Sequence, residues 1–266
     1  MNAAWLAALR AGADVPPLRP RVPLLAGFAC VGSVEPDFLS QIGLKPLSDM
    51  REQLSKIERS GCVSWHVNGD VTLGLNAVAT AMQQAGLGGA WRNEQLAVHD
   101  EQGYRVGTIE RAAVRPLGIA TAAAHLVGFA PDGRVWVQQR AMSKANDPGM
   151  WDTLVGGMVS AADTVQTALV RETWEEAGLR LGDLQTVTHG GRITTRRPAA
   201  DGGGTGYVVE HIDWYCGVVP EGMVPVNQDG EVAQFGLWAP RDVLQRLPQD
   251  HFTTEAALIL AAALGY

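Results

Sequence analysis

The fold can be inferred from one segment of the sequence, Gly157-Met-Val-Ser-Ala-Ala-Asp163-Thr-Val-Gln-Thr-Ala-Leu-Val-Arg171-Glu172-Thr-Trp-Glu175-Glu176-Ala-Gly178-Leu179. Its three glutamates stand at spacings of three and four, and at about 100° per residue such spacings place them on one side of a helix. Like charges so placed repel by about 0.2–0.5 kcal/mol per pair in an isolated helix, so we expect cations to accompany them. Carboxylate oxygens favour Mg²⁺, Mn²⁺ or Ca²⁺ over zinc.

A bare Glu-x-x-Glu-Glu pattern is usually a solvated acidic surface. Here Val165, Ala168 and Leu179 fall on the same helical stripe as the acids, so the acids interrupt a side that faces a core. Val170 and Trp174 make the opposite side apolar as well. We therefore expect both flanks of this helix to be covered and its acids to open into a cleft.

The ends of this helix are marked in the sequence. Asp163, followed by a threonine, is expected to accept a hydrogen bond from a first-turn amide as the N-cap. Gly178 can adopt the left-handed conformation that closes a helix. Residues 151–159 read as a strand, and Gly156-Gly157 is expected to break it and to allow the backbone to approach a ligand.

This arrangement resembles the Nudix signature: a glycine, five residues, an acid, seven residues, then Arg-Glu-apolar-any-Glu-Glu-any-Gly-apolar. The positions that match are Gly157, Arg171, Glu172, Glu175, Glu176, Gly178 and Leu179. Two positions depart from it, since Asp163 replaces a glutamate and Thr173 replaces an aliphatic residue. The resemblance implies an α/β fold, a Nudix α/β/α sandwich with a mixed sheet, and Mg²⁺-dependent hydrolysis of a diphosphate linkage.

The resemblance also implies which residues hold the metal. Glu172, Glu175 and Glu176 are the expected ligands of Mg²⁺, with Mn²⁺ as a substitute, and the carbonyl of Gly156 is an expected additional ligand. Bound cations of this kind neutralise diphosphate oxygens and lower the pKa of an attacking water.

The remaining catalytic roles follow from the same resemblance. Arg171 lies on another face of the helix and is expected to brace Asp163 or a neighbouring loop. Glu231, ahead of the last strand, is the candidate general base, and Glu172 is the alternative. Glu231 is otherwise a plain turn carboxylate.

Three further stretches resemble one branch of the superfamily that carries an N-terminal extension. They are Asp147 to Gly157, Val226 to Phe235, and Phe252 to Leu258. In fungi this branch is similar to the Nudix part of thiamine pyrophosphokinase fusions, which implies hydrolysis of oxo and oxy forms of thiamine diphosphate to monophosphates. Alternatives are nucleoside diphosphate derivatives such as ADP-ribose and NADH, a Nudix isomerase acting on a prenyl diphosphate, and a catalytically weak binding module.

Candidate substrate contacts come from two other places. Arg196 and Arg197 precede three glycines in an expected loop between strands at 185–195 and 205–219, and arginines on a mobile arm can bind a phosphate through two hydrogen bonds. The alternative is an exposed hairpin tip. Trp151 is a candidate wall for an organic ring, and a second set of candidates for that wall is Trp136, Trp214 and Tyr207. His125 lies on an expected strand and is expected to be packed, with a position facing the substrate as the alternative.

Composition bounds the class of protein. Of 266 residues, 46% are hydrophobic and 18% charged, with a net charge of −7, which indicates a globular protein and argues against nucleic acid as a partner. Three cysteines without paired spacing suit a reducing cytoplasm. No apolar run approaches the roughly 18 residues of a membrane span. The expected partners are a small-molecule diphosphate and, as an option, a second copy of the chain in a homodimer.

We expect three segments: an N-terminal helix with a Pro-rich connector (1–23), a small α+β domain (24–115), and the Nudix domain (116–266). The residue before Pro116 avoids the helical region, which suits a boundary. The strands expected elsewhere are 24–34, 62–67, 96–100, 103–109, 119–129, 134–140 and 231–238. The helices expected elsewhere are 36–42, 73–85, 240–247 and 253–264.

Overall fold

The computed structural model describes residues 3–42, 54–59, 61–249 and 251–266. Its largest sheet is formed by β7 (Thr121–Phe129), β8 (Val135–Arg140), β9 (Trp151–Asp152), β10 (Val155–Met158), β11 (Gln185–Ala199), β12 (Gly206–Val218) and β13 (Val232–Trp238). The strand order is β11-β12-β7-β8-β13, with β10 paired to β7 and β9 to β8. Only the β7–β12 pair is parallel among the pairs of this described sheet, so the sheet is mixed.

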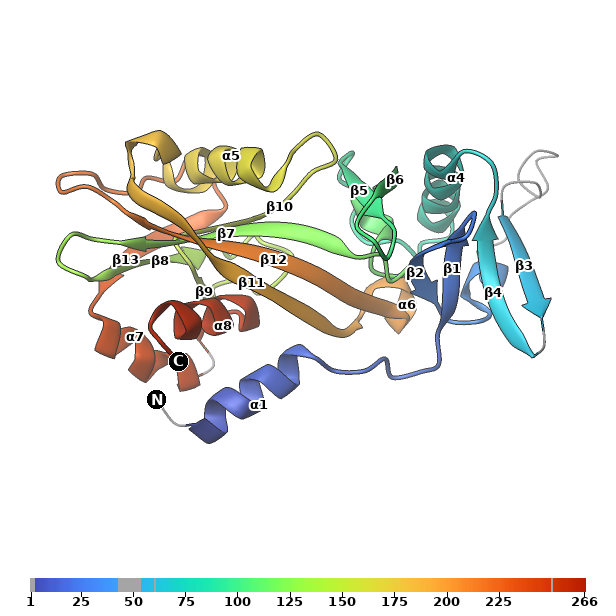
Figure 1. Ribbon diagram of the computed structural model, residues 1–266, viewed down its shortest axis with the longest axis horizontal. Helices are drawn as coiled ribbons and strands as arrows, with labels where there is room; N and C mark the ends of the chain where they lie inside the picture. The colour runs from blue at the N-terminus through green and yellow to red at the C-terminus, as the bar shows by residue number, and fades with distance from the viewer. Residues whose placement is uncertain (1–2, 43–53, 60, 250) are drawn as a thin grey trace.

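Helices cover both faces of this sheet (Figure 1). The acidic helix α5 (Val165–Ala177) lies on one face, and α7 (Pro240–Arg246) and α8 (Thr254–Ala263) lie on the other. Leu126, Leu154 and Leu169 belong to the core under α5, whereas Ile212 and Leu260 belong to the core under α8. The expected α/β fold with a mixed sheet between helices is therefore confirmed.

The hairpin that begins the sheet forms as expected. β7 and β8 pair antiparallel at Gly128–Trp136 and Phe129–Val135. Gly133 turns the chain with φ 84°, a conformation that glycine adopts without steric cost.

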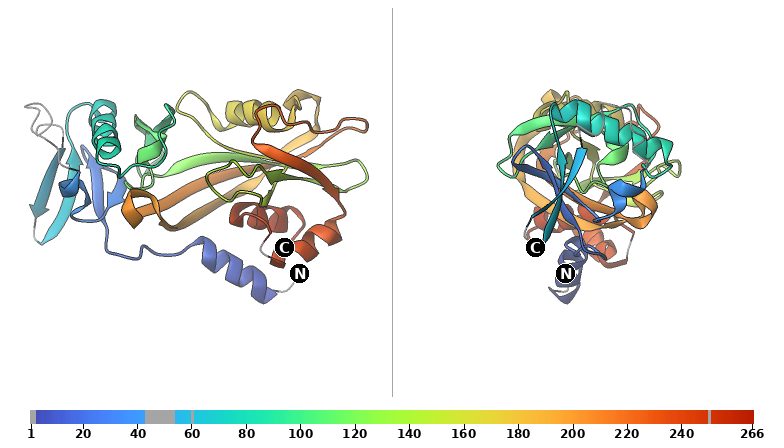
Figure 2. Two further views of the ribbon diagram at one scale, coloured as in Figure 1. Left: turned by 180° about the vertical axis from the view of Figure 1, so that it is seen from behind. Right: turned by 90° about the vertical axis from the view of Figure 1, so that its right-hand side faces the viewer.

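The elements between residues 22 and 110 form a second group at one end of the large sheet (Figure 2). They are β1 (Val22–Ala26), β2 (Ala29–Val34), α2 (Phe38–Gln41), β3 (Leu54–Arg59), β4 (Cys62–Val67), α4 (Val71–Gln84), β5 (Gln95–His99) and β6 (Arg105–Glu110). The first four strands form a sheet in the order β2-β1-β4-β3, and β5 pairs with β6. The buried core of this group lies between Leu24 and Ile119.

Two expectations for this group are corrected. The single strand expected at 24–34 is a hairpin of β1 and β2 that turns at Gly27, where φ is 59°. The strand β3 was not expected, because Lys56 and Glu58 give its sequence a polar character while Leu54 supplies the buried contact.

The first helix packs away from that group. α1 (Ala3–Ala13) carries Trp5, Leu6 and Leu9, which contact the core under α8. The connector then runs to β1, and the hydroxyl of Tyr207 donates to the Val15 carbonyl at 3.1 Å. The division at 23/24 and 115/116 stays a prediction.

The ends and flanks of α5 differ from expectation. Thr164, not Asp163, is the N-cap, and its hydroxyl accepts from the Thr167 amide. Gly178 closes the helix in the left-handed conformation, as expected, with φ 62°. The expectation of two covered flanks is wrong, since Val170 and Trp174 are 52% and 48% exposed.

The strand expected over 151–159 is also two strands. The break lies between β9 and β10, at Thr153 and Leu154, and not at Gly156-Gly157, which lie within β10. β9 pairs with β8 while β10 pairs with β7, so the chain changes partner at the break.

Two absences concern the described residues. Cys30, Cys62 and Cys216 are free thiols, as their spacing suggested. Among the helices in the described ranges, none is both long and apolar enough to cross a membrane.

Candidate active site

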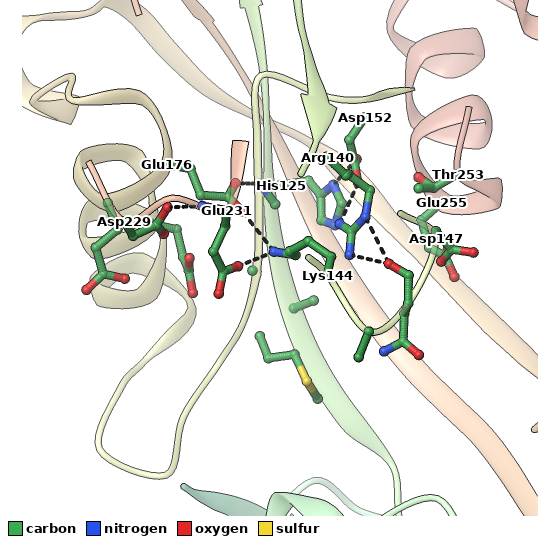
Figure 3. Close-up of a pocket in the computed structure, with 18 of the residues that line it drawn as sticks. His125, Arg140, Lys144, Asp147, Asp152, Glu176, Asp229, Glu231, Thr253 and Glu255 are labelled. Carbon is green, nitrogen blue, oxygen red and sulfur yellow. Dashed lines mark hydrogen bonds and ion pairs between the residues drawn. The ribbon is translucent and has the colours of Figure 1, made fainter. Parts of the chain in front are cut away.

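A cavity of about 560 Å³ opens beside α5, and Figure 3 shows part of its lining. The acidic residues of its lining are Glu94, Asp147, Asp152, Glu172, Glu175, Glu176, Glu210, Asp229, Glu231 and Glu255. The basic residues are Arg92, Arg111, Arg115, Arg140, Lys144, Arg171 and Arg197. The expected cleft is thus present, and α5 contributes one of its walls.

Glu176 is the most deeply buried acid of the helix, with 1% of its surface exposed. One carboxylate oxygen accepts from Gln138 Nε2 at 2.8 Å and from the Gly156 amide at 2.9 Å. Burial raises the pKa of Glu176 to about 8, against the opposing effects of Lys144 and the Gly156 amide. An additional cation beside this carboxylate would lower its pKa and favour the ionised form.

Glu172 lies against the glycine pair of β10. A Cβ added to Gly157 would meet the Glu172 carboxylate at 2.0–2.5 Å, and one added to Gly156 would meet the His125 ring at 2.5–2.9 Å. The bare backbone of these two residues therefore leaves room for an acid on one side and an imidazole on the other. Burial raises the pKa of Glu172.

Arg171 braces the start of its own helix, as expected, but it also lines the cavity, which corrects the expectation that it lies on another face of the helix. Its Nε and one terminal nitrogen donate to Asp163 Oδ2 at 3.1 and 2.9 Å. The other terminal nitrogen donates to Glu172 at 2.8 Å and to Glu175 at 2.9 Å. The shorter acid at 163 thus still reaches the arginine, and one guanidinium holds three carboxylates.

Glu231 lines the cavity beside Lys144, which lies in the loop between β8 and β9. The Lys144 ammonium pairs with Glu231 and lies 3.7 Å from Glu176 (Figure 3). Burial alone would raise the pKa of Glu231, but the hydrogen bond and charge of Lys144 outweigh it and lower that pKa. Asp229 Oδ1 accepts from the Glu231 amide at 2.8 Å and fixes the turn.

His125 is buried, as expected of a packed histidine, and it also lines the cavity. Its Nδ1 lies 2.9 Å from the Thr153 hydroxyl and 3.7 Å from Asp152. Burial lowers the pKa of His125, so the ring is neutral near pH 7. Arg140 balances the buried Asp152 through a contact of 3.2 Å.

The two arginines at 196 and 197 lie in β11 and not in a loop, which corrects the mobile-arm expectation. β11 continues to Ala199, where it pairs with Gly206. Arg197 lines the cavity and donates to Glu255 at 2.5 Å. Arg196 faces Asp14 at 3.6 Å and is not among the cavity-lining residues.

Trp151 is placed in a packing role. Its ring lies 4.4 Å from that of Trp238, and it joins the core under α8. It is not among the residues that line the cavity. The other aromatic candidates for a substrate wall, which lie outside that lining too, are Trp136, Trp214 and Tyr207.

The donor set suits a hard divalent cation. Glu172, Glu175, Glu176, Asp229 and Glu231 line one cavity, and oxygen-only donors suit Mg²⁺ or Mn²⁺. Within the described ranges, no three His, Cys, Asp or Glu side chains already form a metal-binding group. The acids are paired instead with the side chains of Arg171 and Lys144. The residues fit a cation that displaces Arg171 and Lys144 from them.

Sequence reasoning missed several functional contacts. Gln138 and Arg140 lie on β8, and Lys144 follows it in a polar loop. The sequence feature that could have indicated Lys144 is its position as a cationic residue in the loop just before the glycine-containing strand. Arg92 and Arg115, which come from the part before Pro116, had no local signal at all.

Comparison with known proteins adds a family and a fold. The NUDIX domain model matches residues 120–259. An uncharacterized Nudix hydrolase of Pseudomonas aeruginosa, PA4841, is 38% identical over 87 residues, covering 33% of this chain and 52% of that protein. An isopentenyl-diphosphate Delta-isomerase of Streptomyces coelicolor is 28% identical over 169 residues, covering 63% and 82%.

Among solved structures, DR0079 from Deinococcus radiodurans has a TM-score of 0.51 at 20% identity, covering 63% of this chain and 97% of that one. At this identity the likeness shows the fold alone. The chain spans about half the length, or less, of the first curated relatives that it matches.

Proposed function

The chain belongs to the NUDIX family, as the domain match over residues 120–259 shows, and we propose that it is a hydrolase that cleaves the diphosphate linkage of a small molecule. The observation that carries this proposal is the convergence of the three helix glutamates and Glu231 on one cavity that also holds basic side chains. Its proposed cofactor is Mg²⁺, with Mn²⁺ as a substitute.

The helix acids are the proposed metal ligands. Glu172, Glu175 and Glu176 would hold the cations together with the carbonyl of Gly156, whose amide already donates to Glu176. Bound divalent cations would neutralise the diphosphate oxygens and lower the pKa of the attacking water. Arg171 keeps the helix start and the acids in register through Asp163.

Glu231 is the proposed general base. Because Lys144 lowers its pKa, Glu231 is ionised at neutral pH and can accept a proton from water once Lys144 moves aside. Glu172 is the alternative base, since burial raises its pKa and a higher pKa makes a stronger base. Glu231→Gln should lower kcat without weakening Mn²⁺ binding. If Glu172 is the base, Glu231→Gln leaves kcat near the wild-type value.

Substrate phosphates meet the basic residues of the cavity. Arg197 and Lys144 are proposed to contact phosphate oxygens, since both line the cavity and are paired with acids that an anionic phosphate could replace as their partners. Arg196 and Trp151 are not carried into this proposal, because neither lines the cavity.

We propose oxo and oxy forms of thiamine diphosphate as the substrates, with the monophosphate as product. The support is the resemblance of residues 147–157, 226–235 and 252–258 to the thiamine-linked branch. Carboxylates at Glu210 and Glu255 in the cavity can accept hydrogen bonds from ring amino groups. ADP-ribose and NADH remain the alternative substrates.

A prenyl-diphosphate isomerase is the second candidate, favoured by the match that covers 82% of the Streptomyces coelicolor isomerase. Such an isomerase is expected to have a catalytic cysteine close to the metal-binding acids. None of the described residues that line the cavity is a cysteine. Hydrolysis is therefore the better supported reaction.

The test compares Glu175→Gln with wild type in a product assay with Mg²⁺. Glu175 is 41% exposed, so the variant should fold, and losing a metal ligand should slow hydrolysis on the order of 100-fold or more. The matched control is Glu221→Gln, an exposed glutamate outside the cavity. Oxothiamine diphosphate, ADP-ribose, NADH, dinucleoside polyphosphates and isopentenyl diphosphate are assayed side by side. Equal background in both proteins contradicts the enzyme proposal, and a nucleotide turned over far faster than thiamine compounds contradicts the thiamine assignment.

Two further proposals concern the setting of the enzyme. The free cysteines suit a reducing compartment, so we propose a cytoplasmic location, which fractionation of cells would test. A homodimer is proposed as its assembly, and light scattering would measure it.

A further inference from the structure

The part of the chain before Pro116 supplies one wall of the cavity. Arg92, Glu94, Arg111 and Arg115 all line it. The hairpin of β5 and β6 lies beside the loop that joins β10 to α5 (Figure 1). The Ala161 amide in that loop donates to the Gln95 carbonyl at 2.7 Å, so the wall is attached to the segment that leads into the acidic helix.

A buried carboxylate organises this wall. Glu110 is 1% exposed and accepts the backbone amides of Arg92 at 2.9 Å, Glu94 at 3.1 Å and Ala112 at 3.4 Å. The Arg111 amide also donates to the Glu94 carbonyl at 2.8 Å. One acid thus fixes the backbone on both sides of the wall, and charge-assisted bonds of this kind are the stronger ones.

The three arginines of the wall differ in how they are neutralised. Arg111 is paired with Glu94 at 2.7 Å. Arg115 has only long contacts, to Asp201 and to Asn146, both at 3.4 Å. In the described part of the chain, the Arg92 guanidinium has neither a hydrogen bond nor an ion pair, although its backbone is held by Glu110.

We propose that Arg92, supported by Arg115 in the same wall, binds a phosphate group of the substrate, so that residues before Pro116 take part in holding the diphosphate. The planar guanidinium fork matches two phosphate oxygens. A cavity with more acidic than basic lining residues attracts an anion only where positive charge is locally in excess, and Arg92 provides it. The proposal rests on the proposed function for the substrate class, but not on the reaction.

The test measures binding and not turnover. Methylenediphosphonate, a diphosphate analogue that cannot be hydrolysed, is titrated with Mg²⁺ into wild type, Arg92→Ala, Arg92→Lys and Arg241→Ala by calorimetry. Arg241 is an exposed arginine outside the cavity and is the matched control. Loss of one charge-assisted hydrogen bond should raise Kd about tenfold in Arg92→Ala, with Arg92→Lys between the two and Arg241→Ala unchanged.

The outcomes separate this inference from the proposed function. Equal Kd values for Arg92→Ala and wild type overturn the inference, as does wild type that fails to bind the analogue, whatever the hydrolysis assay gives. Binding that depends on Arg92, in a protein that hydrolyses none of the tested compounds, supports the inference and refutes the hydrolase. Because Arg92 is exposed, the Arg92→Ala variant should keep the wild-type melting temperature, which circular dichroism measures.

Discussion

The carboxylate of Glu172 lies so close to Gly157 that a Cβ there would fall 2.0 Å from Glu172 Cδ. The glycine of the strand and the acid of the helix are thus complementary in shape. This contact explains why a strand residue fifteen positions earlier in the chain must lack a side chain.

Gly157→Ala is therefore expected to displace Glu172 while leaving the protein folded, since the obstructed atoms are the end of a flexible side chain. We expect Mn²⁺ affinity to fall about tenfold, as for loss of one well-placed ligand, with a melting temperature close to that of wild type. Electron paramagnetic resonance of free Mn²⁺ measures the affinity. Gly182→Ala is the control, because no atom lies within 4 Å of a Cβ there. Unchanged Mn²⁺ affinity in Gly157→Ala would refute the ligand role of Glu172.

Lys144→Gln should strengthen divalent cation binding. Lys144 lies 3.7 Å from Glu176, a proposed metal ligand, so its positive charge opposes the binding of a cation there. Removing one positive charge at this distance should tighten Mn²⁺ binding roughly fivefold to tenfold. Calorimetric titration measures it, and Lys56→Gln, a lysine outside the cavity that pairs with Asp37, is the control. Weaker binding in Lys144→Gln would place the cation elsewhere.

Asp213 is expected to make stability depend on acid pH. Burial raises the pKa of Asp213, but hydrogen bonds and charge from Arg192 and His189 outweigh it and hold that pKa below its ordinary value. The stabilisation is therefore complete above the unfolded pKa of about 3.9 and is lost as pH falls toward the lower folded value. Asp213→Asn should be less stable than wild type at pH 7, and the difference should shrink below about pH 4. Urea unfolding at several pH values measures it, with the exposed Asp183→Asn as control.

Glu110→Gln should loosen the arginine wall without touching the acidic helix. The amide oxygen of glutamine can replace only one carboxylate oxygen, so one of the part-buried amides of Arg92 and Glu94 loses its acceptor, at a cost of about 1 kcal/mol of unfolding free energy. We expect faster hydrogen exchange at these amides and a several-fold higher KM with kcat unchanged. The exposed Glu101→Gln is the control. A fall in kcat alone would contradict a positioning role.

The acidic helix and its surroundings could be predicted because their signals are local. Gly178 ends the helix by its left-handed backbone, which the sequence reveals. The β7–β8 hairpin follows from its Pro-Asp-Gly turn. The strand break predicted at Gly156 is wrong in position. Glycine indicates only that the backbone is free to bend, whereas the strand ends at Thr153 because the chain changes its pairing partner there.

Other parts of the site depend on the tertiary fold. Arg197 reaches the cavity because β11 continues far past its expected end, held by pairing with β12. Trp151 of β9 contacts Trp238 of β13, a neighbour that no sequence spacing indicates. Arg92 joins the cavity through docking of a separate group of strands.

The guanidinium of Arg171, bonded to Asp163, Glu172 and Glu175, has a consequence for the order of assembly. The guanidinium is a counter-ion supplied by the chain itself, so the acids of the helix do not need an inorganic cation for the helix to fold. Binding of a metal ion to the helix acids would then exchange the positive charge of Arg171 for that of the ion. In a small metallo-domain, by contrast, the free energy of metal binding is also that of folding.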